Sequence, residues 1–271
     1  MKTLLLTAAL ILSPAALANP KLYVFNCGTL SFDNVASFGL TNDETDVREM
    51  FVPCYLIEHE RGRLLFDAGL PLGVVGQGDV IPQPGAVMRY ERSLIDQLAD
   101  LGLAPADVDY IALSHHHFDH AGAANVFTSS TVLIQGSEYE AAFKRAEENE
   151  VFDASLYDKL AESNRITLSG DYDVFGDRST TLVSAPGHTP GHQVLMIRLA
   201  NTGTIVLGGD LFHFRASRKL RRTPVFNTDA EQTLRSMDKV EQLLIDHDAT
   251  LWIEHDMALA KTLDLAPAFY D

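Results

Sequence analysis

The chain has 271 residues, of which 46% are hydrophobic, and this length suits one sizeable domain or two half-domains with a large core. The formal net charge of −16 argues against nucleic acid as a partner, because phosphate binding relies on Lys and Arg. The same charge disfavours anionic membranes, and beyond the N-terminal segment no long apolar run predicts a membrane span.

The first 18 residues predict a secretory leader. Lys2 is followed by an apolar run at residues 4–12 and then by Ala16-Leu17-Ala18, which has the form of a cleavage signal. This run is too short to cross a bilayer, which takes about 20 apolar residues. We therefore expect a signal peptide at residues 1–18 and a mature domain at residues 19–271 that is periplasmic or secreted and free of the membrane. An uncleaved anchor or lipid attachment is the alternative, although no cysteine follows the expected cleavage site to accept a lipid.

Strand patterns open the mature sequence at residues 21–27, 49–58 and 63–66. A helix is predicted over residues 91–101, where leucine and isoleucine recur at helical spacing. The loops at residues 31–48 and 70–90 are long for a compact domain, and long loops beside a site often cover substrate.

Two cysteines, Cys27 and Cys54, lie in the first two strand patterns. An even count in an exported protein is compatible with one disulfide, and adjacent strands would bring the two residues together. Cysteine is also a common small core residue, and a core of this size does not need a bridge. The sequence leaves both interpretations open.

The most informative segment is SHHHFDH at residues 114–120, which follows a short buried-strand pattern. So many imidazole and carboxylate groups cannot form an ordinary buried face, because each would need its own buried partner. A metal would satisfy them. His115 and His117 can point one way as alternate residues of an extended segment, while Asp119 and His120 turn toward a second point. Two neighbouring metals become possible, with a helix expected to open at residues 121–124.

Three more candidate ligands each follow a strand pattern in the second half: His188, on a Gly/Pro turn, Asp210 and His255. Asp210 is well placed to bridge two cations. The strands predicted in this half include residues 181–184, 193–199 and 204–207. A helix is then predicted at residues 229–246, opened by Thr228 as its N-cap.

The motif series resembles the metallo-β-lactamase superfamily and, within it, the N-acyl-homoserine lactone lactonases. Five motifs occur in family order over most of the mature chain: CYLI from Cys54, LLFDAG from Leu64, the histidine cluster, Pro186-Gly187-His188, and Gly209-Asp210 followed by His255. The intervals from His188 to Asp210 and from Asp210 to His255 are also similar to the lactonase pattern. The resemblance implies an α+β fold, an αββα sandwich with a dinuclear metal site at one edge, and a possible homodimer.

The resemblance also implies two sets of metal ligands. One divalent ion would be held by His115, His117 and His188, and a second by Asp119, His120 and His255, with Asp210 and a hydroxide bridging both. Nitrogen-rich ligation fits zinc, which is our first choice, although imidazole also suits cobalt, iron and nickel.

The implied activity is hydrolysis of the lactone ring of N-acyl-homoserine lactones, which silences bacterial signalling (quorum quenching). The hydroxide would attack the carbonyl carbon while one metal stabilises the oxyanion, and Asp119 would pass a proton to the leaving ring oxygen. The lactonases have a tyrosine three positions after the bridging aspartate, and here His213 occupies that place. We expect His213 to assist on the substrate side, the alternative being that it only lines the cleft.

Five other polar residues receive lesser roles. Asp67 is expected to organise the metal loops rather than bind metal, because ligating histidines need outer acceptors. His116 is interpreted as either a neighbour of the ligands or an exposed residue. His192 is expected to be structural, since the preceding Pro-Gly opposes a helix there, and His59 and His247 are expected at the surface.

Two further groups of residues are candidates for contact with the substrate or for attracting it. The candidates for an apolar acyl pocket, each of which is also a candidate for ordinary core, are Phe32, Phe38, Met88, Phe212, Phe214 and Phe226. Residues 215–222 carry five cations, which either form a solvated loop or steer a polar substrate.

Two other functions stay open at this point. The same scaffold serves hydrolases of other lactones, thioesters, organophosphates or β-lactams, although Asp210 counts against those zinc β-lactamases that lack a bridging carboxylate. A signal-binding protein without turnover is the alternative from a different class. Metal analysis together with a hydrolysis assay on acyl-homoserine lactones distinguishes these functions.

Overall fold

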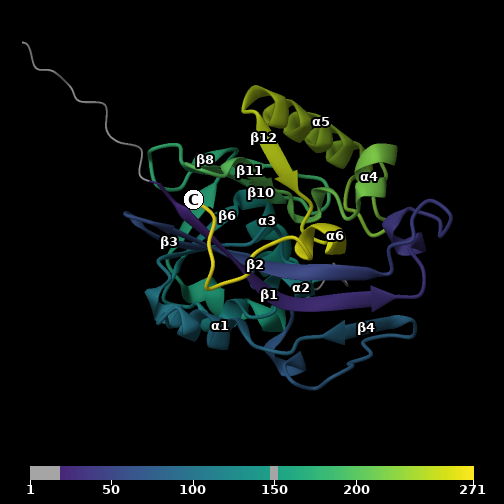
Figure 1. Cartoon of the computed structure of the whole chain (residues 1–271), viewed down its shortest axis with the longest axis horizontal. Helices are drawn as coiled ribbons and strands as arrows, with labels where there is room; N and C mark the ends of the chain where they lie inside the picture. The colour runs from purple at the N-terminus through teal and green to yellow at the C-terminus, as the bar shows by residue number, and fades with distance from the viewer. Residues whose placement is uncertain (1–18, 147–151) are drawn as a thin grey trace, which may run out of the picture.

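Two β-sheets lie face to face in the computed structural model, which describes residues 19–146 and 152–271 (Figure 1). The predicted signal peptide, residues 1–18, lies outside the described residues. The first sheet has the order β4-β1-β2-β3-β5-β6-β7 and the second the order β12-β11-β10-β9-β8.

The strands of the first sheet are β1 (Lys21–Phe32), β2 (Glu49–His59), β3 (Gly62–Phe66), β4 (Ala86–Arg89), β5 (Tyr110–Ala112), β6 (Thr131–Gln135) and β7 (Arg165–Leu168). Those of the second are β8 (Tyr172–Asp173), β9 (Thr180–Ser184), β10 (Gln193–Leu199), β11 (Gly203–Leu207) and β12 (Ala249–Trp252). The helices are α1 (Leu94–Asp100), α2 (Phe118–Ala121), α3 (Gly136–Tyr139), α4 (Arg215–Leu220), α5 (Ala230–Asp246) and α6 (Met257–Ala260).

Alternating side chains of the strands build the layer between the two sheets. Leu22 and Val24 of β1 face inward, where they belong to one buried cluster with Leu195 and Ile197 of β10. Because side chains alternate along a strand, the residues between them point to the outer faces.

Helices cover those outer faces. Phe25 of β1 joins a cluster with Leu94 and Leu98 of α1, and Met196 of β10 joins another with Val240 of α5. Strands buried on both sides have the near-continuous apolar runs seen in the sequence. The expected αββα sandwich is confirmed, with α5 and β12 together on one side of the molecule (Figure 1).

Two local predictions about helix starts are wrong. A helix was expected to open at residues 121–124, but α2 begins at Phe118 and ends at Ala121. The backbone N–H of Gly122 donates to the carbonyl of Gly69 instead of continuing the helix. At α5 the N-cap is Asp229, whose side chain accepts from the N–H of Gln232, whereas the N–H of Thr228 donates to His188.

Cys27 and Cys54 form a disulfide that joins β1 to β2, with their Cα atoms 5.9 Å apart. This settles the alternative that the sequence left open. The last residues pack beside β1, where Leu22 and Tyr270 exchange backbone hydrogen bonds. Within residues 19–146 and 152–271, no helix combines the length and the apolar character that crossing a bilayer would require.

Candidate metal centre

All seven predicted ligands lie in segments that follow strands, and the fold brings them to one place. The segment after β5 carries His115 and His117, and α2 immediately continues it with Asp119 and His120. From the second sheet, His188 follows β9, Asp210 follows β11 and His255 follows β12. The ligands therefore come from both sheets and meet beyond the ends of these strands.

The seven side chains divide into two donor sets, and every member is buried. We call them the first donor set (His115, His117, His188, Asp210) and the second donor set (Asp119, His120, His255). In each set the potential ligand atoms lie within 4.8 Å of one another. The division is the one that the resemblance implied.

Asp210 lies between the two sets and offers one oxygen to each. Its Oδ2 is 3.2 Å from Nε2 of His188 and 3.5 Å from Nε2 of His115. Its Oδ1 is 2.8 Å from Nε2 of His255 and 3.2 Å from Nε2 of His120. A carboxylate placed in this way can bridge two cations.

The spacing of the first donor set fits a tetrahedral metal. Nε2 of His188 lies 3.2 Å from both Nε2 of His115 and Nδ1 of His117. Donors at the zinc–nitrogen distance of about 2.0–2.1 Å, arranged as a tetrahedron, lie about 3.3 Å apart. At the second set, Nε2 of His120 and of His255 and the facing Oδ1 of Asp210 are buried and lie close together, but none of them makes a well-aligned hydrogen bond. Both sets therefore fit a divalent metal.

Outer partners orient the ligand imidazoles. Nδ1 of His188 lies 3.0 Å from Oδ1 of Asn227, and Nδ1 of His255 lies 2.8 Å from the carbonyl oxygen of Phe51. Because these oxygens are acceptors, each Nδ1 carries the proton, and each Nε2 is left with the lone pair that a metal needs.

Asp67 orients His120 in the same way, as predicted. Its Oδ2 lies 2.8 Å from Nδ1 of His120, and its Oδ1 accepts the N–H of Ser114 at 2.6 Å. Asp67 has a left-handed backbone with φ of 60°, which aspartate tolerates better than most residues. Asp67, His120 and Glu254 form a third group that could hold a metal ion. Both of these carboxylates lie beside Nδ1 of His120, whereas Asp210 lies beside its Nε2.

Burial and charge set the protonation of His115, His117 and Asp210. Burial, with the charge of nearby imidazoles, lowers the pKa of His115 and His117 well below the usual value, so both are neutral and able to bind metal. Burial alone would raise the pKa of Asp210, but the imidazoles of His213 and His120 outweigh it and hold that pKa well below the usual value. Asp210 is therefore ionised.

Positive charge gathers on the second donor set. Burial alone would lower the pKa of His120 and His255, but the carboxylate of Asp210 outweighs it and raises both. The buried carboxylates thus attract positive charge to this point, and a cation would supply it.

The two other histidines of the cluster region are not in the donor sets. His192 accepts the N–H of Asp210 at Nε2 and donates from Nδ1 to the carbonyl of Ala185, which agrees with a structural role. His116 is buried, and its ring contacts Phe143 and Tyr157 instead of the ligands.

A cleft of about 530 Å³ opens above the donor sets. At its floor lie His117, Asp119, Asp210 and His213. Its remaining walls are mostly apolar and are formed by Leu30, Ser31, Phe32, Ser37, Phe38, Met50, Pro82, Gln83, Ala86, Phe118, Asp153 and Phe226. The two long loops that the sequence singled out thus border the cleft.

Half of the aromatic and methionine candidates for the acyl pocket line this cleft. Phe32, Phe38 and Phe226 do so, and the Phe38 ring packs on both the Phe226 and His213 rings. The other three candidates, Met88, Phe212 and Phe214, are core residues.

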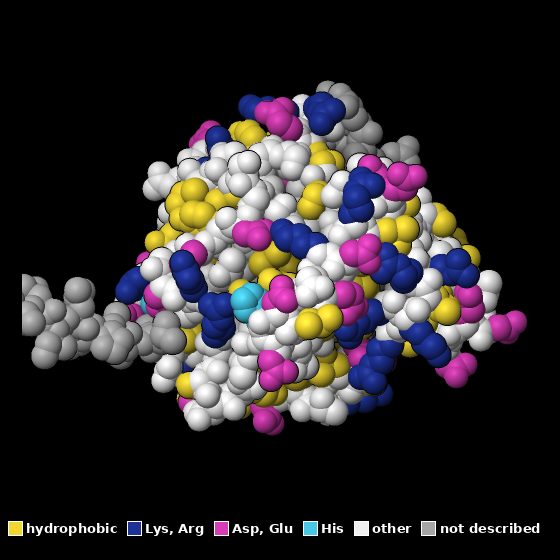
Figure 2. All heavy atoms as spheres, turned by 90° about the horizontal axis from the view of Figure 1, so that it is seen from above, with side chains coloured by type: hydrophobic (Ala, Val, Ile, Leu, Met, Phe, Trp, Pro, Cys, Tyr) yellow, Lys and Arg dark blue, Asp and Glu magenta, His cyan; other side chains and the backbone are white. Residues whose placement is uncertain are grey.

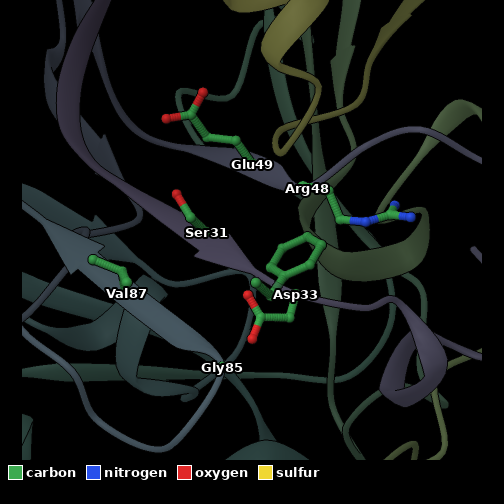
Figure 3. Close-up of a pocket in the computed structure, with 7 residues that line it drawn as sticks. Ser31, Asp33, Arg48, Glu49, Gly85 and Val87 are labelled. Carbon is green, nitrogen blue, oxygen red and sulfur yellow. The ribbon is translucent and has the colours of Figure 1, made fainter.

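A second hollow, of about 390 Å³, lies next to the cleft and shares Ser31 and Phe32 with it. Figure 3 shows Ser31, Val87 and Glu49 on neighbouring strands, where they pair in register across β4, β1 and β2. The Arg48 side chain donates to the backbone carbonyls of Thr45 and Val47. None of these side chains belongs to a donor set.

Comparison with known proteins agrees with this geometry. The family model described as the metallo-beta-lactamase superfamily matches residues 47–246. The chain belongs to the metallo-β-lactamase superfamily.

The chain is similar over most of its length to several N-acyl homoserine lactonases. An N-acyl homoserine lactonase, AttM, of Rhizobium radiobacter is 32% identical over 263 residues, which cover 92% of this chain and 98% of the relative. The N-acyl homoserine lactonase AiiA of Bacillus thuringiensis subsp. kurstaki is 29% identical over 262 residues, with the same coverage.

A solved N-acyl homoserine lactone hydrolase has the product N-hexanoyl-L-homoserine bound at its catalytic metal centre. It superposes with a TM-score of 0.79 at 27% identity, covering 93% of this chain and 99% of that chain. AidC, a dizinc quorum-quenching lactonase, shares the fold with a TM-score of 0.67 at 17% identity.

The metallo-β-lactamase motifs did not reveal three residues around the ligands. Asn227 binds His188, Glu254 accepts the N–H of Gly209 at 2.8 Å, and Glu138 binds two of the ligand loops. Glu254 immediately precedes His255, and Glu138 follows β6, so the pattern of a strand followed by a polar residue was a usable signal for both. Asn227 gave no such signal.

One prediction about an outlying histidine is wrong. His59 is buried, stacks on Phe175 with ring centroids 4.2 Å apart, and bonds to Asp177 at 2.9 Å. His59 ends β2 and is covered by the loop between β8 and β9, which contains Phe175 and Asp177, so its ring does not reach solvent. His247 is partly exposed.

The five cations of residues 215–222 lie on the helix α4 (Arg215–Leu220) and on the two residues that follow it, rather than on a solvated loop. Four of the five cations pair with carboxylates: Arg215 with Asp256, Arg218 with Glu241, Arg221 with Asp238 and Arg222 with Glu44. Figure 2 shows basic side chains interspersed with acidic ones over the face on the side of α5 and β12. This pairing weakens the interpretation as a steering patch.

Proposed function

We propose that this chain is a metal-dependent hydrolase that opens the lactone ring of N-acyl-homoserine lactones. One observation carries the proposal: the two oxygens of Asp210 face two separate donor sets at the floor of a cleft with apolar walls. The lactonases named above supply the substrate class.

The first donor set would hold one divalent cation and the second donor set the other, with Asp210 shared. Zinc is the metal that we propose, because the donors are mainly imidazole and the spacing is tetrahedral. When bound, paired cations would lower the pKa of a water molecule and polarise the lactone carbonyl.

Asp119 and His213 are the residues that we assign to proton and substrate handling. Asp119 lines the cleft, so its carboxylate lies where the lactone would bind. It would take up the proton of the attacking water and pass it to the departing ring oxygen. Nε2 of His213 lies 3.0 Å from Oδ2 of Asp210, which places the ring beside the shared carboxylate at the floor of the cleft. Burial lowers the pKa of His213, so its ring is neutral, and its one N–H would be donated to the lactone carbonyl oxygen once Asp210 holds metal.

The apolar walls suit the acyl chain of the substrate. Phe32, Phe38 and Phe226 are each partly exposed, so they offer ring surface to a ligand. Burying an acyl methylene against such surface contributes about 0.8 kcal/mol.

We also propose that the protein works outside the cytoplasm. The disulfide between Cys27 and Cys54 supports this, because disulfides persist in oxidising compartments, and the leader pattern at residues 1–18 agrees with it. The expected homodimer stays a prediction, which sedimentation of the purified protein would test.

The proposed activity is tested by proton release from acyl-homoserine lactones of several chain lengths, using zinc-loaded protein. Ring opening releases one carboxylic acid, and acidification of the product restores the lactone. Cleavage of the amide would release an amine instead. Faster hydrolysis of thioesters, phosphotriesters or β-lactams than of every acyl-homoserine lactone would refute the proposal, and binding without turnover would make the chain a signal-binding protein.

A further inference from the structure

Glu138 is a buried carboxylate that lies outside both donor sets and binds a backbone N–H in each of two ligand loops. It belongs to α3, which follows β6 and carries none of the predicted ligands. Its side chain is 2% exposed, so its bonds are shielded from water. Burying a carboxylate is costly unless its oxygens accept hydrogen bonds, and these two bonds offset that cost.

One oxygen of Glu138 holds the loop of His115 and His117. Oε1 accepts the backbone N–H of His116 at 3.2 Å, in the peptide segment between these two ligands. Because the bond is made by the backbone, it fixes the direction of the chain from which both imidazoles project.

The other oxygen holds the loop of His188. Oε2 accepts the backbone N–H of Gly191 at 2.8 Å. This loop is closed on itself, because the carbonyl of Thr189 accepts the N–H of Gly187 on one side and the N–H of His192 on the other. A displacement of Gly191 is therefore transmitted to His188.

The approach of α3 to the His188 loop is too close for a side chain at position 191. A Cβ on Gly191 would lie 2.4 Å from the backbone nitrogen of Glu138 and 2.5 Å from its Cβ. Ser137 adds a bond from its hydroxyl to the carbonyl of Pro190 at 2.8 Å. The contact between α3 and this loop is thus made by several groups and leaves little freedom.

We propose that Glu138 is the positioning residue of the first donor set. It joins the segment that bears His115 and His117 to the turn that bears His188, and so sets how firmly that set retains its metal. The role rests on the proposed metal centre but not on the proposed substrate. Asp67, which bonds to His120, has the corresponding place beside the second donor set.

The substitution Glu138→Gln changes one atom of this arrangement. An amide has one acceptor oxygen, and its NH₂ group would face a second N–H donor, so one of the two loops loses its bond. Glu138→Ala removes both bonds. Losing such an outer partner typically lowers metal affinity about 10- to 100-fold.

The test measures metal release from the full chain. Zinc-loaded protein is mixed with a chromogenic chelator, and the phase that is lost in His188→Ala identifies metal leaving the first donor set. In Glu138→Ala we expect this phase to accelerate about 10- to 100-fold, with a smaller change in Glu138→Gln. The phase of the second donor set should stay near the wild-type rate, and Asp67→Asn should show the reverse selectivity.

Asp173 is a matched control, because its two oxygens also accept one backbone N–H each, from Gly176 and Arg178, within its own turn. Asp173→Ala should leave both release phases unchanged.

Unchanged release in folded Glu138→Ala would overturn the proposal. So would equal acceleration of both phases with a lower melting temperature of the metal-free protein, which is the behaviour of a merely structural residue. If Glu138→Ala does not fold, Glu138→Gln decides by the same criterion. Wild-type protein that holds two metals but opens no lactone would refute the proposed function and leave this test intact.

Discussion

The disulfide between Cys27 and Cys54 offers a quantitative test of how the fold is held together. We consider the double variant Cys27→Ala/Cys54→Ala, in which the cross-link is lost and two buried positions keep small apolar side chains. In the chain-entropy model, a cross-link stabilises the native state by reducing the freedom of the unfolded chain, and the effect grows with the length of the loop that it closes.

The magnitude follows from the separation of 27 positions between the two cysteines. For a loop of this length the lost entropy corresponds to about 3.5 kcal/mol at 25 °C. We expect urea unfolding of the metal-free double variant to give a free energy of unfolding lower than that of the wild type by this amount. Metal-free protein is used because a ligand that binds only the native state adds stability of its own.

The bridge also supports the segment that orients His120. Gly69 adopts a φ of 66°, and a Cβ there would lie 2.3 Å from Cβ of Cys27 and 2.9 Å from Sγ of Cys54. The next residue donates its N–H to the carbonyl of Cys27, and Ala68 donates to the carbonyl of His120. We therefore also expect the double variant to release metal faster from the second donor set.

A control separates the cross-link from packing. Cys27→Ala/Cys54→Val refills part of the space but restores no cross-link, so its stability should stay close to that of the double alanine variant. A loss below about 1 kcal/mol in both variants would refute the loop-entropy reasoning.

Three further predictions concern the site. Asp210→Asn removes the charge shared by both donor sets, so elemental analysis should show that both metals are lost, with activity reduced about 100-fold or more. His116→Ala should keep both metals, because Glu138 accepts a hydrogen bond from the backbone of His116 and not only from its side chain. His213→Phe removes an N–H donor from the cleft, so kcat should fall about 100-fold at unchanged metal content, while His213→Tyr should retain activity. Burial lowers the pKa of His192 to about 3 from 6.5, so in acid the unfolded chain binds a proton there that the native protein does not. This contribution to stability is fully present above about pH 6.5 and is lost as the pH falls. The loss reaches about 2 kcal/mol at about pH 5, and His192→Gln should abolish this part of the pH dependence.

Each of these predictions has its own contrary result. Full metal content in Asp210→Asn would contradict the bridging assignment, and metal loss in His116→Ala would contradict the placement of that ring outside the donor sets. Equal kcat in wild type and His213→Phe would reduce that side chain to cleft lining. For His192, urea unfolding of metal-free protein at two pH values is the measurement, and an identical pH dependence in His192→Gln would contradict the reasoning.

The sequence predicted the ligand loops well because each begins where an apolar strand ends. Strands such as β10 and β11 have strong β-branched and leucine patterns, and the predicted bounds of β10 match the observed ones. Ligand residue types are also conspicuous, since imidazoles and carboxylates next to such strands have few other uses.

The failures concern groups whose partners are distant in the sequence. His59 lies in a polar stretch, and only the folded chain shows that Asp177, far along the sequence, makes it a buried residue. The end of α2 is decided by a hydrogen bond to Gly69, and the choice of Asp229 over Thr228 as N-cap depends on the contact between Thr228 and His188. Local pattern cannot reveal such tertiary competition.

The ligands are divided between the halves of the chain, and this has a consequence for assembly. The segment from His115 to His120 belongs to the first sheet, whereas His188, Asp210 and His255 follow strands of the second. Neither half contains a complete donor set of its own. If the chain were cut between β7 and β8 and the two fragments were expressed separately, divalent ions would promote their association, and a chelator would cause them to dissociate.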